Sequence, residues 1–234
     1  RFTLDLMAVA APPELLVASQ LAGLDEVRHA QLAFSLARRF AADNSNMGQD
    51  NAAPRFAPGP FPVDLPGYTG KESLAIGLHR LALGTVVEGC LHETLSAVLA
   101  SVSLERTEDA DTAQALEVIW SDEAQHAALA WRTAQWALRQ KEVNVTALSV
   151  AFDDAASSAG NSLGGDSGVD DLVLPAYGQL GAANLLEATR ESLRSFLRPW
   201  AAALFTGEPM PPVECDTAVG RAACAVMQHL KALN

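Results

Sequence analysis

The sequence predicts an all-α protein: a four-helix bundle with one long crossover connection, followed by a C-terminal helical extension. Long Ala- and Leu-rich stretches carry apolar residues at spacings of three and four, and no run alternates with period two long enough for a sheet. The predicted helices come in two pairs, each joined by a tight turn, with a long irregular segment between the pairs. That order is typical of a bundle with one crossover.

The first pair of helices lies before residue 43. Residues 1–10 resemble the last turns of an apolar helix, and because no initiator Met precedes them we expect an upstream segment to be missing. Pro12 and Pro13 with Glu14 predict the first turn of a helix that runs to about Ala42. Residues 43–70 are rich in proline, glycine and asparagine, which favours an irregular crossover.

The second pair starts at a predicted capping box over residues 69–72, in which Thr69 and Glu72 would each satisfy a helix N–H. This helix should reach about Leu104. Thr107, followed by two acidic residues, is a predicted cap for a helix that continues to about Gln140. Residues 1–140 therefore form the predicted bundle.

The remaining chain is divided into a connecting segment at 141–170 and the extension at 171–234. A short helix is predicted over 145–157, and the Gly- and Ser-rich residues 155–170 predict a loop. A further helix is predicted from Ala182 to about Leu197, and Pro199 should kink or stop it.

Composition narrows the classes of function. The 234 residues are 49% hydrophobic and 6% aromatic, with 16 basic and 28 acidic residues, for a formal charge of -12. This balance repels a phosphate backbone, so we expect no nucleic-acid partner. No uninterrupted apolar stretch approaches the roughly 20 residues that span a bilayer, so we expect no membrane partner.

Three cysteines are too few for a disulfide framework, and we expect a reducing cytoplasm. Cys215 and Cys224 could pair, but two free thiols are the favoured expectation. Cys90 is predicted to be a core thiol.

A repeated motif carries the chemistry. Asp25-Glu26-Val27-Arg28-His29 and Asp122-Glu123-Ala124-Gln125-His126 both have the form D-E-x-x-H, and neighbouring residues continue to match at a constant separation of 97. Glu and His three apart project from one helix face and can bind one ion together. Two such units, with one Glu from each remaining helix, form the ligand set of dinuclear carboxylate bundles.

Geometry predicts the position of a further carboxylate. Reflecting Glu123 and His126 across a turn centred near Arg106 leads to about residues 89 and 86, so Glu88 is the predicted ligand and Glu93 the weaker candidate. The same reflection in the first half points upstream of Arg1. We therefore expect a fourth carboxylate in the missing segment, or a site that lacks one bridge.

Three further residues are predicted to lie around the ligands. Asp25 and Asp122 each sit one turn before a ligand His, where each can accept the free imidazole N–H of the His on the facing helix. The alternative for both is an ordinary surface charge. His92, one turn after Glu88, could line the cavity, act as an extra ligand or pack in the core.

These strings resemble the ferritin-like superfamily of di-iron carboxylate proteins. The D-E-x-R-H string is similar to helices of bacterial multicomponent monooxygenases and ribonucleotide reductase small subunits. Residues 88–94, with the sequence EGCLHET, resemble the third helix of uncharacterised bacterial ferritin-like domain proteins. The resemblance implies that the metal ligands are Glu26, His29, Glu88, Glu123 and His126.

The leading functional hypothesis is an O₂-activating di-iron oxidase or oxygenase that acts on a small organic substrate. Carboxylates stabilise oxidised ions, so two iron ions are the first choice of cofactor and manganese the second. An electron donor and a homo-oligomer are further expectations left open. The alternatives are an iron-handling or peroxide-scavenging protein of the ferritin and rubrerythrin kind, and a metal-free helical interaction module.

Overall fold

The computed structural model describes residues 1–45, 73–161 and 174–232. All regular structure in these ranges is helical, which confirms the all-α prediction. The α-helices are α1 (Phe2–Ala8), α2 (Pro13–Ser45), α3 (Leu74–Gly84), α4 (Thr94–Arg106), α5 (Ala110–Leu138), α6 (Val145–Asn161), α7 (Ala182–Ser192), α8 (Arg198–Thr206) and α9 (Ala218–Ala232). Two π-helices, η1 (Thr85–Glu93) and η3 (Leu193–Leu197), and one 3₁₀-helix, η2 (Leu174–Tyr177), complete the described structure.

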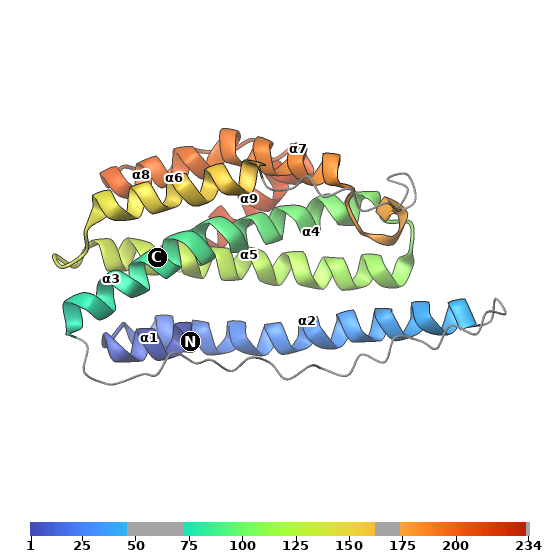
Figure 1. Cartoon of the computed structure of the whole chain (residues 1–234), viewed down its shortest axis with the longest axis horizontal. Helices are drawn as coiled ribbons and strands as arrows, with labels where there is room; N and C mark the ends of the chain where they lie inside the picture. The colour runs from blue at the N-terminus through green and yellow to red at the C-terminus, as the bar shows by residue number, and fades with distance from the viewer. Residues whose placement is uncertain (46–72, 162–173, 233–234) are drawn as a thin grey trace.

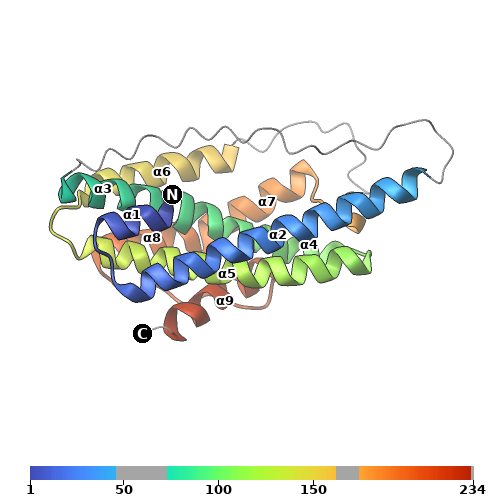
Figure 2. The same cartoon turned by 90° about the horizontal axis from the view of Figure 1, so that it is seen from below.

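The helices lie in layers (Figure 1). α1 and α2 form the lower layer of that view, α5 and the continuous α3–η1–α4 helix form the middle, and α6, α7 and α8 form the upper. α9 packs against both α4 and α5, and α2 packs on α5. Seen from below, α2 crosses α5 obliquely, and the two helices meet near their middles (Figure 2). α5 is therefore the central helix, because it contacts α2 of the lower layer as well as α4, η1 and α9.

The main apolar core extends from α5 into the C-terminal helices. Trp131 of α5 and Trp200 of α8 are fully buried and meet edge to face, with ring centroids 5.7 Å apart. Phe152 of α6 and Phe196 of η3 belong to the same buried cluster. The predicted C-terminal extension thus shares its core with α5, because burying these aromatic side chains removes a large apolar area from water.

A smaller apolar cluster holds the lower layer to the middle one. Leu6, Leu15, Leu78 and Leu129 come from α1, α2, α3 and α5, and each is almost fully buried. This cluster fixes how α2 lies across α5, and so determines which residues of the two helices face each other.

Some predicted helix ends need correction. α3 begins with Ser73 as its N-cap, whose hydroxyl accepts from the Ile76 N–H, whereas the predicted capping box at 69–72 lies outside the described residues. The N-cap of α5 is Asp109 rather than Thr107. The Asp109 carboxylate accepts from the Thr112 N–H at 2.8 Å, while the Thr107 hydroxyl donates to the Ala176 carbonyl.

The helix over 145–157 is longer than predicted, and Pro199 has a different effect. α6 continues to Asn161, so the first part of the predicted loop at 155–170 is helical; residues 162–170 lie outside the described residues. Pro199 does not stop the helix: α7, η3 and α8 follow one another without a break, and Pro199 lies directly after the π-helix η3. Irregular turns of this kind are where a helix accommodates proline.

The continuous helix Leu74–Arg106 is long and apolar enough, by length and composition, to cross a membrane, with a mean hydropathy of 1.4 over its most apolar window. In the structure it packs on α5, and 44% of that window is buried inside the protein. Core helices pass the same test, so this criterion alone is weak support for a membrane span.

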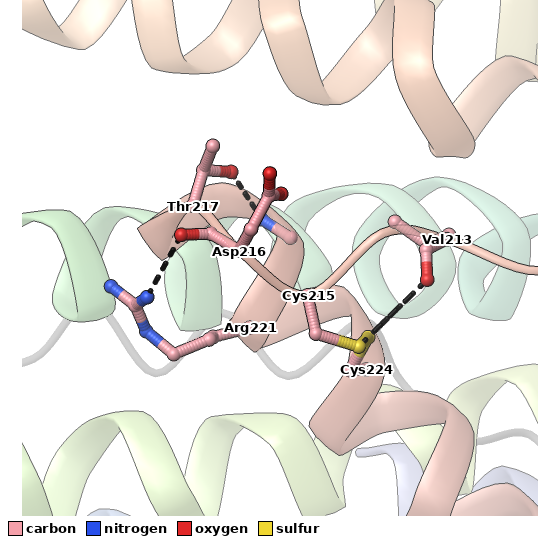
Figure 3. The surroundings of a disulfide bond; sticks show 7 residues. Val213, Cys215, Asp216, Thr217, Arg221 and Cys224 are labelled. Carbon is pink, nitrogen blue, oxygen red and sulfur yellow. Dashed lines mark hydrogen bonds between the residues drawn. A yellow bond between two sulfur atoms is a disulfide. The ribbon is translucent and has the colours of Figure 1, made fainter.

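Cys215 and Cys224 form a disulfide, which corrects the expectation of two free thiols (Figure 3). The chain before α9 folds back on the helix, where Thr217 accepts from the Gly220 N–H, and brings the two Cα atoms to 6.0 Å. A Cα–Cα distance of 6.0 Å lies in the usual range for a disulfide, so these two cysteines, nine residues apart in sequence, can bond. A Cβ at Gly220 would lie 2.0 Å from the carbonyl oxygen of Glu214, so this return needs glycine.

Candidate metal centre

The two D-E-x-x-H motifs face each other across the contact between α2 and α5. The helices run antiparallel (Figure 1), and the motif residues lie near the middle of each. His29 and His126 are both buried, and their ring centroids are 6.0 Å apart. The repeat seen in the sequence thus becomes an approximately two-fold arrangement of side chains.

Each histidine is held by the aspartate of the opposite helix. Nε2 of His29 lies 3.0 Å from Oδ2 of Asp122, and Nε2 of His126 lies 3.4 Å from Oδ2 of Asp25. These are the two cross-helix contacts predicted from the sequence. The aspartate contact favours a proton on Nε2 of each ring, which leaves the Nδ1 lone pair available to a cation.

The two Nδ1 atoms face glutamates. Nδ1 of His29 lies 3.3 Å from Oε1 of Glu123, and Nδ1 of His126 lies 3.3 Å from Oε1 of Glu26. Glu26, Glu93, Glu123 and His126 each offer one ligand atom within 4.8 Å of the others. One imidazole nitrogen, from His126, and three carboxylate oxygens therefore converge on one small region, and the predicted ligand His29 lies outside this group, with Nδ1 facing Glu123.

Glu93, and not Glu88, supplies the carboxylate from the middle layer, so the predicted register is wrong. The Glu88 side chain is 76% exposed and lies 3.0 Å from Nδ1 of His92, outside the convergent group. The turn between α4 and α5 is centred near residue 108 instead of Arg106, which moves the position facing Glu123 to Glu93.

The π-helix η1 lies beyond Glu93 as counted from the turn, so it affects the residues before Glu93, including Glu88. Its i→i+5 hydrogen bonds need more residues per turn than the roughly 3.6 of an α-helix, so Glu88 does not lie on the face that α-helical spacing predicts. Gly89 lets η1 approach α5 closely, because a Cβ there would lie 2.4 Å from Cβ of Ala130. Glu93 ends this π-helix and points to the site.

The carboxylates of the site repel one another. Burial, a hydrogen bond with Glu93 and the charges of Glu93, Glu26 and Asp122 raise the pKa of Glu123 to about 9. The protein without metal therefore keeps a proton on Glu123 at neutral pH, and a cation would replace it.

Asp122 shows the opposite balance. Burial alone would raise the pKa of this carboxyl, but hydrogen bonds from Arg28 and His29 outweigh burial and lower the pKa. Asp122 is thus an anion that accepts the Nε2 proton of His29.

Other candidate residues lie outside the convergent group. His92 is about half exposed beside Glu88. Asp5 of α1 pairs with Arg80 at 3.1 Å, so it does not contribute to the group. Cys90 is fully buried, as predicted, and burial raises the pKa of its thiol well above the usual range.

A cavity of about 310 Å³ opens onto the site. Glu26, Glu93 and His126 line it together with apolar groups that include Phe2 and Leu129. Glu88 also lines the cavity, so it lies near the site, but its carboxylate is not among the converging ligand atoms.

Sequence reasoning gave no role to Arg28. Its guanidinium is hydrogen-bonded to Asp122 and lies 3.3 Å from Oδ1 of Asp25. The signal was present as the arginine of the D-E-x-R-H string, where the second copy has Gln125.

Comparison of the chain with protein-family models, with curated proteins and with solved structures found no match.

Proposed function

We propose that this protein is a dinuclear metal carboxylate protein whose ligands are Glu26, His29, Glu93, Glu123 and His126. The observation that carries the proposal is the crossed arrangement of the two motifs. In each histidine Nε2 lies within hydrogen-bond distance of the aspartate on the opposite helix, and Nδ1 faces the glutamate on that helix. Metal-binding histidines characteristically have such an outer partner, which fixes the tautomer.

The charge of the group supports cations as its occupants. Three glutamates meet in a partly buried region, and burial together with the neighbouring carboxylates raises the pKa of Glu123. His126 converges with three glutamates, and His29 faces Glu123 at 3.3 Å on the other side of an approximate two-fold relation. One imidazole on each side supports two ions.

The proposed architecture is the ferritin-like four-helix bundle with one crossover. In this assignment α1, α2, the α3–η1–α4 helix and α5 are the four members, and ligands come from three of them. The packing of α1 on α2 and α3, and of α5 on α2 and α4, supports it. The predicted crossover lies mainly outside the described residues.

The proposed activity is O₂ activation by two iron ions, with manganese as the alternative metal, and oxidation of a small organic substrate. Mixed carboxylate and imidazole ligation suits iron or manganese, whereas Mg²⁺ prefers oxygen ligands alone and Zn²⁺ a smaller tetrahedral set. When bound, the metals would supply the redox chemistry. The adjoining cavity offers room for a small reactant.

Anaerobic loading with Fe(II), removal of free metal and metal analysis test the centre, and oxygen-electrode measurements then test the activity. We expect up to two irons per chain and O₂ consumption that depends on them. Glu93→Gln should lower the iron content, whereas Glu88→Gln, a matched loss of one exposed carboxylate, should leave it near the wild-type value.

Each other outcome contradicts a definite part of the proposal. No retained iron would remove the metal centre. Retained iron without O₂ consumption would remove the oxidase. Uptake of many irons per chain would instead favour an iron-handling protein.

A further inference from the structure

One guanidinium group contacts both of the aspartates that hold the histidines. Nη2 of Arg28 is hydrogen-bonded to Oδ2 of Asp122 on the facing helix and lies 3.3 Å from Oδ1 of Asp25 on its own helix. The same Oδ2 of Asp122 is 3.0 Å from His29, and the other oxygen of Asp25 is 3.4 Å from His126. Arg28 therefore joins the two outer contacts into one network.

The network is asymmetric although the motifs repeat. The counterpart of Arg28 in the second motif is Gln125, whose exposed side-chain amide donates to the Ser121 carbonyl on its own helix. A single arginine thus serves both halves of an otherwise two-fold site. Both contacts come from the same terminal nitrogen, Nη2, so the length of the arginine side chain, which brings Nη2 between the two carboxylates, determines the contact.

The Arg28 side chain is 50% exposed, but the contact that it supports is buried. The Asp122 side chain is 9% exposed and that of His29 is 10% exposed, so few water molecules reach their contact. A buried carboxylate that loses its cationic partner is left without compensation. The Asp122 side chain would then turn toward water, and its hydrogen bond with Nε2 of His29 would be lost.

We propose that Arg28 is a positioning residue that fixes the orientation and tautomer of both His29 and His126 through Asp122 and Asp25. This inference rests on the proposed metal centre. The inference extends the proposed centre, because one residue that is not a ligand aligns both histidine ligands. Loss of Arg28 should weaken both metal positions together.

The test compares Arg28→Ala and Arg28→Lys with two controls. Arg39→Ala removes another α2 guanidinium that bonds two carboxylates of the α5 region, Asp109 at 2.7 Å and Asp111 at 2.6 Å, away from the histidines. Gln125→Ala removes the repeat counterpart. Two-dimensional ¹H–¹⁵N spectra of the imidazoles, recorded on chelator-treated protein, report the tautomers, and Co(II) titration followed by visible absorption reports affinity and stoichiometry.

We expect the Nε2–H tautomer at both histidines in the wild type and in both controls. Arg28→Ala should give mixed tautomers and a Co(II) affinity at least about tenfold lower at both positions, as is typical when an outer partner is lost. Arg28→Lys keeps the charge on a shorter side chain that does not place its nitrogen where Nη2 lies, so it should restore part of the affinity.

Unchanged tautomers and affinity in Arg28→Ala, while the wild type binds Co(II), would overturn this inference alone. An equal loss of affinity in Arg39→Ala would also overturn it, since helix packing would then account for the effect. A wild type that binds no Co(II) would overturn the proposed centre and this inference together.

Discussion

The proton held by Glu123 makes the stability of the metal-free protein depend on pH. In the unfolded chain this carboxyl has a pKa of 4.5, and burial with the neighbouring Glu93 raises the folded pKa to about 9. Below the unfolded pKa both states are protonated. Between the two values only the folded state keeps the proton, so folding stability falls as pH rises through this window.

The magnitude follows from the linkage. One proton retained only by the folded state changes the free energy of unfolding by at most about 1.4 kcal/mol per pH unit. The Glu123 side chain is 10% exposed, so water screens this effect only in part. From about pH 6 to about pH 8 we expect a loss of up to about 2.7 kcal/mol from this group.

Glu123→Gln removes the titrating group and should remove this slope. Urea denaturation of chelator-treated protein at several pH values in the window would measure the free energy of unfolding for both proteins. Glu88→Gln is the control, because it deletes an exposed carboxylate of the same type and should keep the wild-type slope. Parallel pH profiles for the wild type and Glu123→Gln would refute the reasoning.

Three further predictions concern packing and stability. Gly89→Ala forces η1 away from α5, so it should lower the free energy of unfolding by about 1–3 kcal/mol and also lower metal affinity. Gly84→Ala is the control, because nothing lies within 4 Å of its added Cβ, and it should change neither quantity. Thermal denaturation and Co(II) titration measure the two effects. Replacing both Cys215 and Cys224 by serine should lower stability by about 2–3 kcal/mol, and a reductant should lower the thermal midpoint of the wild type but not of the double variant. Asp109→Ala removes the α5 cap and should lower the free energy of unfolding near neutral pH, as measured by urea denaturation. Because hydrogen bonds from Arg39 and Thr112 lower the pKa of Asp109 from 3.8 to about 2, the wild type should lose this advantage as pH falls through that range.

The part of the site on α2 and α5 could be predicted from the sequence because both motifs lie on uninterrupted α-helices. On such helices residue spacing determines the face, so the pairing of His29 with Asp122 and of His126 with Asp25 followed from the repeat alone. The all-α class followed from the same periodicity.

The part contributed by the middle layer could not be predicted in the same way. A π-helix has no periodicity signal of its own in this sequence, and the turn before α5 is centred two residues later than expected. The later turn places Glu93 opposite Glu123, and the wider turns of η1 change the face on which Glu88 lies. The disulfide was missed for a related reason, since the return of the chain onto α9 depends on contacts between backbone segments that residue spacing does not reveal.

The bond between Cys215 and Cys224 also sets a condition on where the chain should be produced. Disulfides persist where thiols are oxidised, as in the periplasm or the endoplasmic reticulum, whereas glutathione and thioredoxin keep cytosolic cysteines reduced. A host cytosol would therefore yield a chain whose α9 start is secured by the Thr217 cap and the Arg221–Glu105 ion pair without the covalent link. Expression with export to an oxidising compartment is the matching choice for preparing this protein.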